Sequence, residues 1–95
     1  MPNSAIDFPW QWTHVDDTLL VKTGGGALHS IALNYLNPGD TVLVYDGVDA
    51  TGALMGVIGT DLSQPALLLY DAKIETGIFI DRTGQGVIDL TVNWV

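Results

Sequence analysis

Hydrophobic and polar residues alternate with a period of two towards the end of the chain. Every second residue is apolar from Ile88 to Trp94, and the residues between them are polar. Successive side chains of a β-strand point to opposite faces, so the pattern predicts a final strand over residues 86–94, with one face in a core and the other in solvent. A similar alternation predicts one continuous strand over residues 73–81.

Shorter apolar runs, separated by glycine, proline and Asp-Gly, predict the remaining strands. They cover residues 18–23, 27–35, 41–45, 53–58 and 66–70. The sequence NPGD at residues 37–40 predicts a type II turn, because proline presets φ and glycine supplies a positive φ. Short strands at this spacing predict an all-β fold, a single small antiparallel β-sandwich of jelly-roll type with about seven or eight strands.

The length and composition fit one globular domain. With 95 residues the chain can close one hydrophobic core but not two. Its 47% apolar and 15% charged residues exclude a disordered chain, and so little charge indicates that part of the apolar surface contacts a partner. We expect residues 1–17 to form an N-terminal arm and residues 18–95 to form the sandwich. The chain has no cysteine, which excludes disulfides and thiolate metal sites.

The charge of the chain argues against nucleic acid as a ligand. Acidic residues number 11 against three basic ones, and the net charge of −8 repels a phosphate backbone. No apolar stretch approaches the roughly 20 residues needed to span a bilayer, and the start of the chain lacks the features of a secretory signal. We therefore expect neither a nucleic-acid nor a membrane partner, and a protein that acts where it is made or leaves within an assembly.

Two hexamers, VLVYDG at residues 42–47 and LLLYDA at residues 67–72, both carry Tyr-Asp after an apolar triplet. We interpret each Tyr-Asp as a strand end, where Asp46 or Asp71 accepts backbone N–H groups of the following turn. The alternatives are an acid–base pair of these aspartates or, with Asp49, a calcium site. A small sandwich has little material for a catalytic cleft, and DGVDATG lacks the alternating ligands of a calcium loop. No catalytic residue, metal or cofactor is predicted.

The adjacent residues His29 and Ser30 could be taken for a catalytic base and its nucleophile. Neighbours on a strand point to opposite faces, which predicts that the two side chains do not form a dyad. We expect His29 to be buried or to lie at an interface. The three glycines at 24–26 are predicted to form a turn rather than a phosphate site, because the GxxxxGK[ST] pattern and a following helix are missing. The chain is therefore predicted not to be an enzyme.

The most unusual segment is N-terminal, where Phe8, Trp10 and Trp12 alternate across Pro9. In an extended chain these three aromatic side chains share one face. They either form an edge strand that tucks under the domain's own core, or they bind a neighbouring subunit or a larger partner, because tryptophan is enriched at the energetic centres of interfaces. Stacking of tryptophan on sugar rings keeps a carbohydrate-binding module as a further alternative.

Several stretches of the chain together resemble a group of small virion proteins of tailed bacteriophages. They are LLVKTGGGALHSIALN, DTVLVYDG, ATGALMGVIGT, LLLYDAKIETGIFI and the closing GVIDLTVNWV, which follow one another over residues 19–95. In that group a Val-Lys-Thr-Gly strand, a Gly-x-Leu-His strand and two Tyr-Asp segments recur in this order before a terminal Thr-Val strand. The resemblance implies a capsid decoration (cement) or head-fibre protein, often trimeric.

We therefore expect a non-enzymatic virion structural protein on the outside of a phage head, assembled in the host cytoplasm. Its expected partners are the major capsid protein, bound through the three N-terminal aromatic residues, and further copies of itself. The predicted interface of a cyclic trimer comprises Leu43, Tyr45, Leu68 and Tyr70. A lone sandwich would leave the faces that carry these residues partly exposed. The alternatives are a tail or baseplate adhesin or fibre component, and a carbohydrate-binding module.

Overall fold

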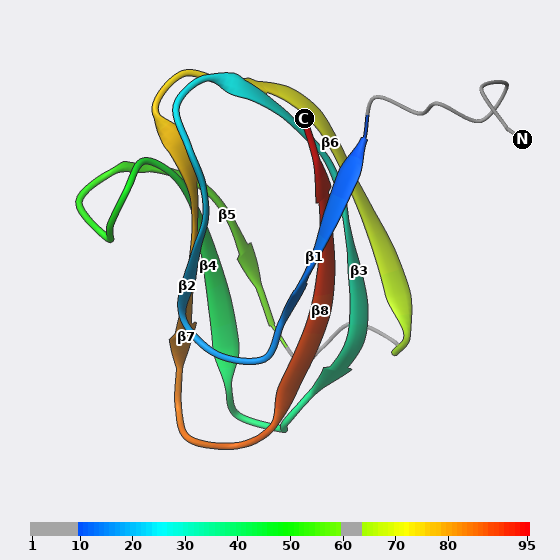
Figure 1. Cartoon of the computed structure of the whole chain (residues 1–95). Coiled ribbons are helices and arrows are strands. Elements are labelled where there is room, and N and C mark those ends of the chain that lie inside the picture. The colour runs from blue at the N-terminus through cyan, green and yellow to red at the C-terminus, as the bar shows by residue number, and fades with distance from the viewer. Residues whose placement is uncertain (1–9, 60–63) are drawn as a thin grey trace, which may run out of the picture.

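The described chain consists of eight β-strands and no helix, which confirms the predicted all-β fold (Figure 1). The structure is a computed structural model, and it describes residues 10–59 and 64–95. The strands are β1 (Gln11–Val15), β2 (Leu19–Thr23), β3 (Gly26–Leu36), β4 (Thr41–Asp46), β5 (Ala53–Ile58), β6 (Ala66–Ile74), β7 (Gly77–Thr83) and β8 (Ile88–Trp94). The short apolar runs of the sequence correspond to strands of this fold.

The strands form two four-stranded antiparallel sheets in a jelly-roll arrangement. The first sheet has the order β1-β8-β3-β6 and the second the order β2-β7-β4-β5. The first strand pairs with the eighth, the second with the seventh, the third with the sixth and the fourth with the fifth. The two halves of the chain therefore pair as one long antiparallel hairpin, which is folded into two sheets. This pairing confirms the predicted sandwich of jelly-roll type.

The core lies between the two sheets and contains the inward side chains of both. Its buried members are aliphatic: Val15, Leu28, Ile31, Leu33, Leu36, Val42, Val44, Ile58, Ile74, Ile78, Ile80, Ile88, Leu90 and Val92. Alternate residues of β8 are buried, as the sequence pattern predicts. Burial of each such side chain stabilises the fold by about 1.5–3 kcal/mol relative to leaving it exposed. This single core holds both sheets in place and leaves two outer faces for solvent or partners.

The prediction of one strand over residues 73–81 is wrong, because the chain changes sheet within that range. β6 ends at Ile74 in the first sheet and β7 begins at Gly77 in the second. Both Ile74 and Ile78 are buried in the same core. The apolar alternation continues through the turn because each strand turns one face to the shared core, and so the pattern by itself cannot locate the crossing.

The N-terminal aromatic segment contributes a strand to the sandwich. β1 pairs along its length with β8, at the edge of the first sheet, and its residue Val15 is buried in the core. Of the two alternatives for this segment, edge-strand pairing therefore describes residues 11–15. The described sandwich therefore begins at Gln11, within the range 1–17 that was expected to form an arm. The reason is that Val15 is buried in the core and β1 pairs with β8. Phe8 lies outside the described residues.

The lower end of the sandwich in Figure 1 is held by a turn and a largely buried ion pair. In the predicted turn at 37–40, Gly39 has φ 90° and the Asp40 N–H donates to the Asn37 carbonyl at 3.0 Å, which confirms a turn with positive φ at its third position. Arg82 Nη2 lies 3.0 Å from Asp40 Oδ2, and the Gly86 N–H donates to the same oxygen at 2.9 Å. These contacts tie the β7–β8 loop to the β3–β4 turn.

Candidate functional site

The first Tyr-Asp segment ends a strand, as predicted, and its aspartate binds a turn of the opposite hairpin. Asp46 closes β4 and accepts backbone N–H bonds from Glu75 at 3.0 Å, from Thr76 at 2.9 Å and from Gly77 at 3.2 Å. These N–H groups favour the ionised carboxylate and lower the pKa of Asp46 from its ordinary value. The carboxylate therefore fixes the turn at which the chain crosses between the sheets.

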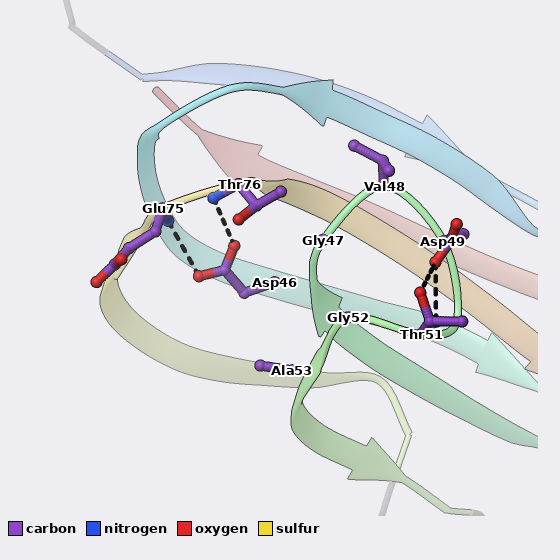
Figure 2. A pocket seen from close by; sticks show the side chains of 9 residues that line it. All are labelled: Asp46, Gly47, Val48, Asp49, Thr51, Gly52, Ala53, Glu75 and Thr76. Carbon is purple, nitrogen blue, oxygen red and sulfur yellow. Dashed lines mark hydrogen bonds between the residues drawn. The ribbon is translucent and has the colours of Figure 1, made fainter.

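Beside Asp46 lies an open hollow of about 500 Å³, lined by the β4–β5 loop and the β6–β7 turn (Figure 2). Asp49 accepts bonds from the Thr51 N–H at 2.9 Å and the Thr51 hydroxyl at 2.5 Å, which lower the pKa of Asp49. The Glu75 carboxylate points away from the hollow in Figure 2. Within the described residues no group of three or more His, Cys, Asp or Glu could hold a metal ion. Asp49 therefore holds its own loop, and Asp46 holds the turn of the opposite hairpin.

The second Tyr-Asp segment differs from the first, and the prediction that it ends a strand is wrong. β6 continues to Ile74, and Asp71 lies inside it with a left-handed φ of 45°. The Asp71 carboxylate contacts His29 Nδ1 at 2.5 Å, and the ring of Trp10 stacks on the His29 ring with centroids 4.4 Å apart. The irregular backbone at Asp71 therefore positions a carboxylate, a histidine and a tryptophan together on the outside of the first sheet.

The argument that strand neighbours face opposite ways fails at His29 and Ser30. The register of β3 shifts between Leu28 and Ser30, so a bulge inserts His29 between an inward residue and an outward one. Both His29 and Ser30 therefore lie on the outer side. The Ser30 hydroxyl accepts a bond from Asn93 Nδ2 at 3.0 Å, and no described hydrogen bond joins it to His29. The pair shares a face without forming a nucleophile–base contact.

The four residues predicted for the trimer interface are divided between an outer face and the interior. Leu43 and Tyr45 lie outward on β4, since the intervening Val44 is buried in the core. Leu68 and Tyr70 point inward from β6 and pack against the core. Tyr70 reaches the second sheet, where a Cβ on Gly56 would lie 2.8 Å from its hydroxyl, and this burial raises its pKa. Leu68 and Tyr70 are therefore core residues rather than outer-face residues.

The outer face of the second sheet is apolar across all four strands. We call it the apolar face and define it by Leu20, Leu43, Tyr45, Leu54, Val57 and Phe79. The register places Leu20, Phe79, Tyr45 and Leu54 in one row across the sheet and Leu43 beside Val57 in the next. Leu54 and Val57 are 55% and 57% exposed. The rings of Tyr45 and Phe79 lie 6.3 Å apart between centroids.

The outer face of the first sheet has apolar residues at its two edges and polar residues between them. We call it the tryptophan face and define it by Trp12 on β1 and by Leu67 and Leu69 on β6. Trp12 is 71% exposed, and the two leucines are 63% and 67% exposed. The middle strands place Ser30 and Asn93 opposite each other between these edges. Large apolar side chains are therefore exposed on both outer faces of the same sandwich.

A polar network lies lower on the tryptophan face. Asp89 Oδ1 contacts His14 Nε2 at 2.8 Å and accepts a bond from Asn34 Nδ2 at 3.1 Å. These bonds lower the pKa of Asp89, with His14 as the largest cause. The network cross-links three strands of the first sheet on its solvent side.

Sequence reasoning missed Leu20, Leu54, Val57 and Phe79 as members of an exposed face. The signal for two of them, Leu54 and Val57, was present, because β5 reads ALMGVI and has no polar residue for a solvent side.

No helix in residues 10–59 and 64–95 is long and apolar enough to cross a membrane. Comparison with protein-family models, with curated proteins and with solved structures finds no match for this chain.

Proposed function

We propose that the chain is a non-enzymatic structural protein of a phage particle, which decorates the outer surface of the head by binding the major capsid protein. The observation that carries the proposal is the exposure of large apolar side chains on both outer faces of one jelly roll. A decoration protein needs one surface for the shell and another for its own copies. The resemblance of residues 19–95 to phage decoration and head-fibre proteins supports the same assignment.

The tryptophan face is the surface we assign to the capsid. Its three defining residues expose on the order of 400 Å² of apolar surface, and covering it contributes roughly 10 kcal/mol before the cost of association is subtracted. In the trimer that we expect, three such faces would point outward to the surrounding capsid subunits, and their joint avidity would greatly exceed that of one contact.

The charge distribution supports a position outside the shell. The net charge of −8 repels packaged nucleic acid, whereas the outer surface of a capsid imposes no such penalty. Jelly rolls also occur in both viral capsid and lectin domains, so the fold is compatible with this role without selecting it.

Co-sedimentation with capsids of the encoding phage that lack this protein tests the proposal. We expect the wild-type chain to pellet with the capsids and Trp12→Ala to bind about 10- to 100-fold more weakly. Val48→Ala is the control, because Val48 is another exposed apolar residue but lies in the β4–β5 loop, on neither outer face. A variant that lacks residues 1–9 keeps β1 and tests the contribution of Phe8. Failure of the wild-type protein to bind any such capsid would refute the decoration role.

A carbohydrate-binding module is the second candidate, favoured by the exposed ring of Trp12, which the strand register places opposite the polar side chain of Asn93. Such a module binds glycans as an isolated protein. Saturable binding to a glycan array, lost in Trp12→Ala, together with no capsid binding, would select this function over decoration.

A further inference from the structure

The apolar face carries almost none of the charge of the chain. Among the described residues, Asp81 is the one acidic side chain that the strand register places on it, beside Leu43. Its carboxylate accepts a bond from the Thr18 hydroxyl at 3.2 Å. The next row is made by Thr41 and Thr83, whose hydroxyls lie 2.6 Å apart. An apolar centre with a hydroxyl rim is the composition of a protein–protein interface.

A second copy of the chain fits the apolar face better than a charged partner does. Copies with a net charge of −8 repel one another, and the repulsion is smallest where each presents its least charged surface. The apolar face is such a surface, and every copy has one. A partner that recognised this chain through charge would instead contact the acidic side chains that lie elsewhere.

Neither edge strand of the second sheet offers an uninterrupted ladder for strand addition. An exposed edge strand can extend its ladder into a partner, but irregularities in the strand block this. The register shifts within the β2 pairing, between Leu20 and Lys22, and within the β5 pairing, opposite Val44 and Tyr45. Both edge strands of the second sheet are therefore interrupted, whereas the side chains of their outer face form continuous rows.

The area of the apolar face matches that of an interface core. Its six side chains expose about 400 Å² of apolar surface, taking roughly 200 Å² for a fully exposed large side chain. A standard interface covers about 800 Å² on each partner, and in homodimers about 65% of it is apolar. The face therefore supplies most of the apolar core of one such interface, and the threonine rim supplies polar area around it.

We infer that the apolar face is the self-association surface of this protein, occupied by a second copy of the same chain. This inference rests on the proposed function, since it names the surface through which copies on the capsid would join one another. In a cyclic trimer the apolar faces of the copies turn towards the symmetry axis, and the tryptophan faces, on the opposite side of each sandwich, point outward to the surrounding capsid subunits.

The test compares matched leucine-to-glutamate changes on two neighbouring edge strands. Leu54→Glu alters the apolar face on β5, and Leu67→Glu alters the tryptophan face on β6 at a similar exposure. Sedimentation velocity of the purified proteins across the micromolar range measures association, and circular dichroism confirms folding. We expect an oligomer for the wild type, association weakened at least about 100-fold in Leu54→Glu, and no change in Leu67→Glu.

Hydrogen exchange of the wild-type protein provides a second measurement that needs no variant. Amides of β4 and β5 are expected to gain protection as the protein concentration rises, whereas those of β1 gain none. A wild-type monomer throughout, an unchanged oligomer in Leu54→Glu, or dissociation by Leu67→Glu overturns the inference. Capsid binding separates the two claims, because an oligomer that binds no capsid removes only the decoration role, and a monomer that still pellets with capsids removes only the self-association surface.

Discussion

Removal of the Asp46 carboxylate is expected to destabilise the fold through a turn that lies about 30 residues away in sequence. Oδ1 accepts the N–H groups of Thr76 and Gly77, and Oδ2 accepts that of Glu75. A hydrogen bond to a charged group contributes about 1.5–3 kcal/mol, but this carboxylate is open to water, so about 1 kcal/mol for each is the appropriate scale. We expect Asp46→Ala to lower the free energy of unfolding by about 2 kcal/mol, since water replaces part of the loss.

Asparagine at position 46 separates the two carboxylate oxygens. Its carbonyl oxygen can still accept the two N–H groups that Oδ1 binds, whereas its amide nitrogen meets the third N–H as a second donor. Asp46→Asn should therefore cost about 1 kcal/mol, half the cost of alanine. Urea unfolding at one fixed protein concentration, followed by tryptophan fluorescence, measures both values. Asp49→Ala is the control, and its loss of stability should be clearly smaller than that of Asp46→Ala, because Asp49 bonds only within its own loop.

The pH dependence provides an independent measurement of the same contact. The pKa of Asp46 is lower in the folded chain than its ordinary value of 3.8, so its stabilisation is complete above that pH and is lost as the pH falls through the folded value. The stability difference between wild type and Asp46→Asn should therefore be full at neutral pH and should shrink below about pH 4. Equal midpoints for wild type and Asp46→Ala at neutral pH would refute the structural role of this carboxylate.

Three further predictions concern packing, association and metal. Gly56→Ala places a Cβ 2.8 Å from the Tyr70 hydroxyl and should lower the free energy of unfolding in urea by about 1–2 kcal/mol. Tyr70→Phe in the same chain should restore part of this loss. If the losses of the two single variants simply add in the double variant, the contact is contradicted. Asp81→Asn removes the carboxylate of the apolar face and should tighten self-association several-fold by sedimentation, whereas weaker association would show that a partner cation binds it. Chelator should leave the melting temperature unchanged, and a drop that calcium reverses would reveal a metal site.

The fold could be predicted from the sequence because its strands are short, alternating and separated by strong turn formers. The turn at 37–40 is a local property of proline and glycine, and the structure has it. The crossing at Glu75 and Thr76 was not predictable from alternation, because residues on both sides of it face one core. What fixes the crossing is Asp46, a residue distant in sequence, and periodicity carries no information on such a contact.

The candidate surfaces were predicted only in part, because an apolar run does not show which of its two alternating sets of residues faces the core. Leu43 and Tyr45 lie on an outer face, whereas Leu68 and Tyr70 occupy the equivalent positions of a similar hexamer and point inward. The two hexamers belong to different sheets. In the first hexamer the residues before and after Leu43 face the core, whereas in the second hexamer Leu68 itself faces the core. Sequence similarity between segments of one chain therefore did not translate into the same orientation.

The loop between Gly47 and Gly52 begins and ends at nearly the same point, which makes it suitable for insertions. The two glycines approach so closely that a Cβ on Gly47 would lie 2.7 Å from the Gly52 Cα, and the loop projects from the sandwich as a separate lobe (Figure 1). Val48, Asp49 and Ala50 are exposed at its tip. Residues inserted between Val48 and Asp49 keep the bonds of Thr51 and Gly52 to Asp49 and the close approach of Gly47 and Gly52, and lengthening a surface loop costs little closure entropy. The ends of β4 and β5 are therefore expected to stay where they are. This tip is therefore the place to graft a foreign epitope, which the assembled protein would then present at every copy.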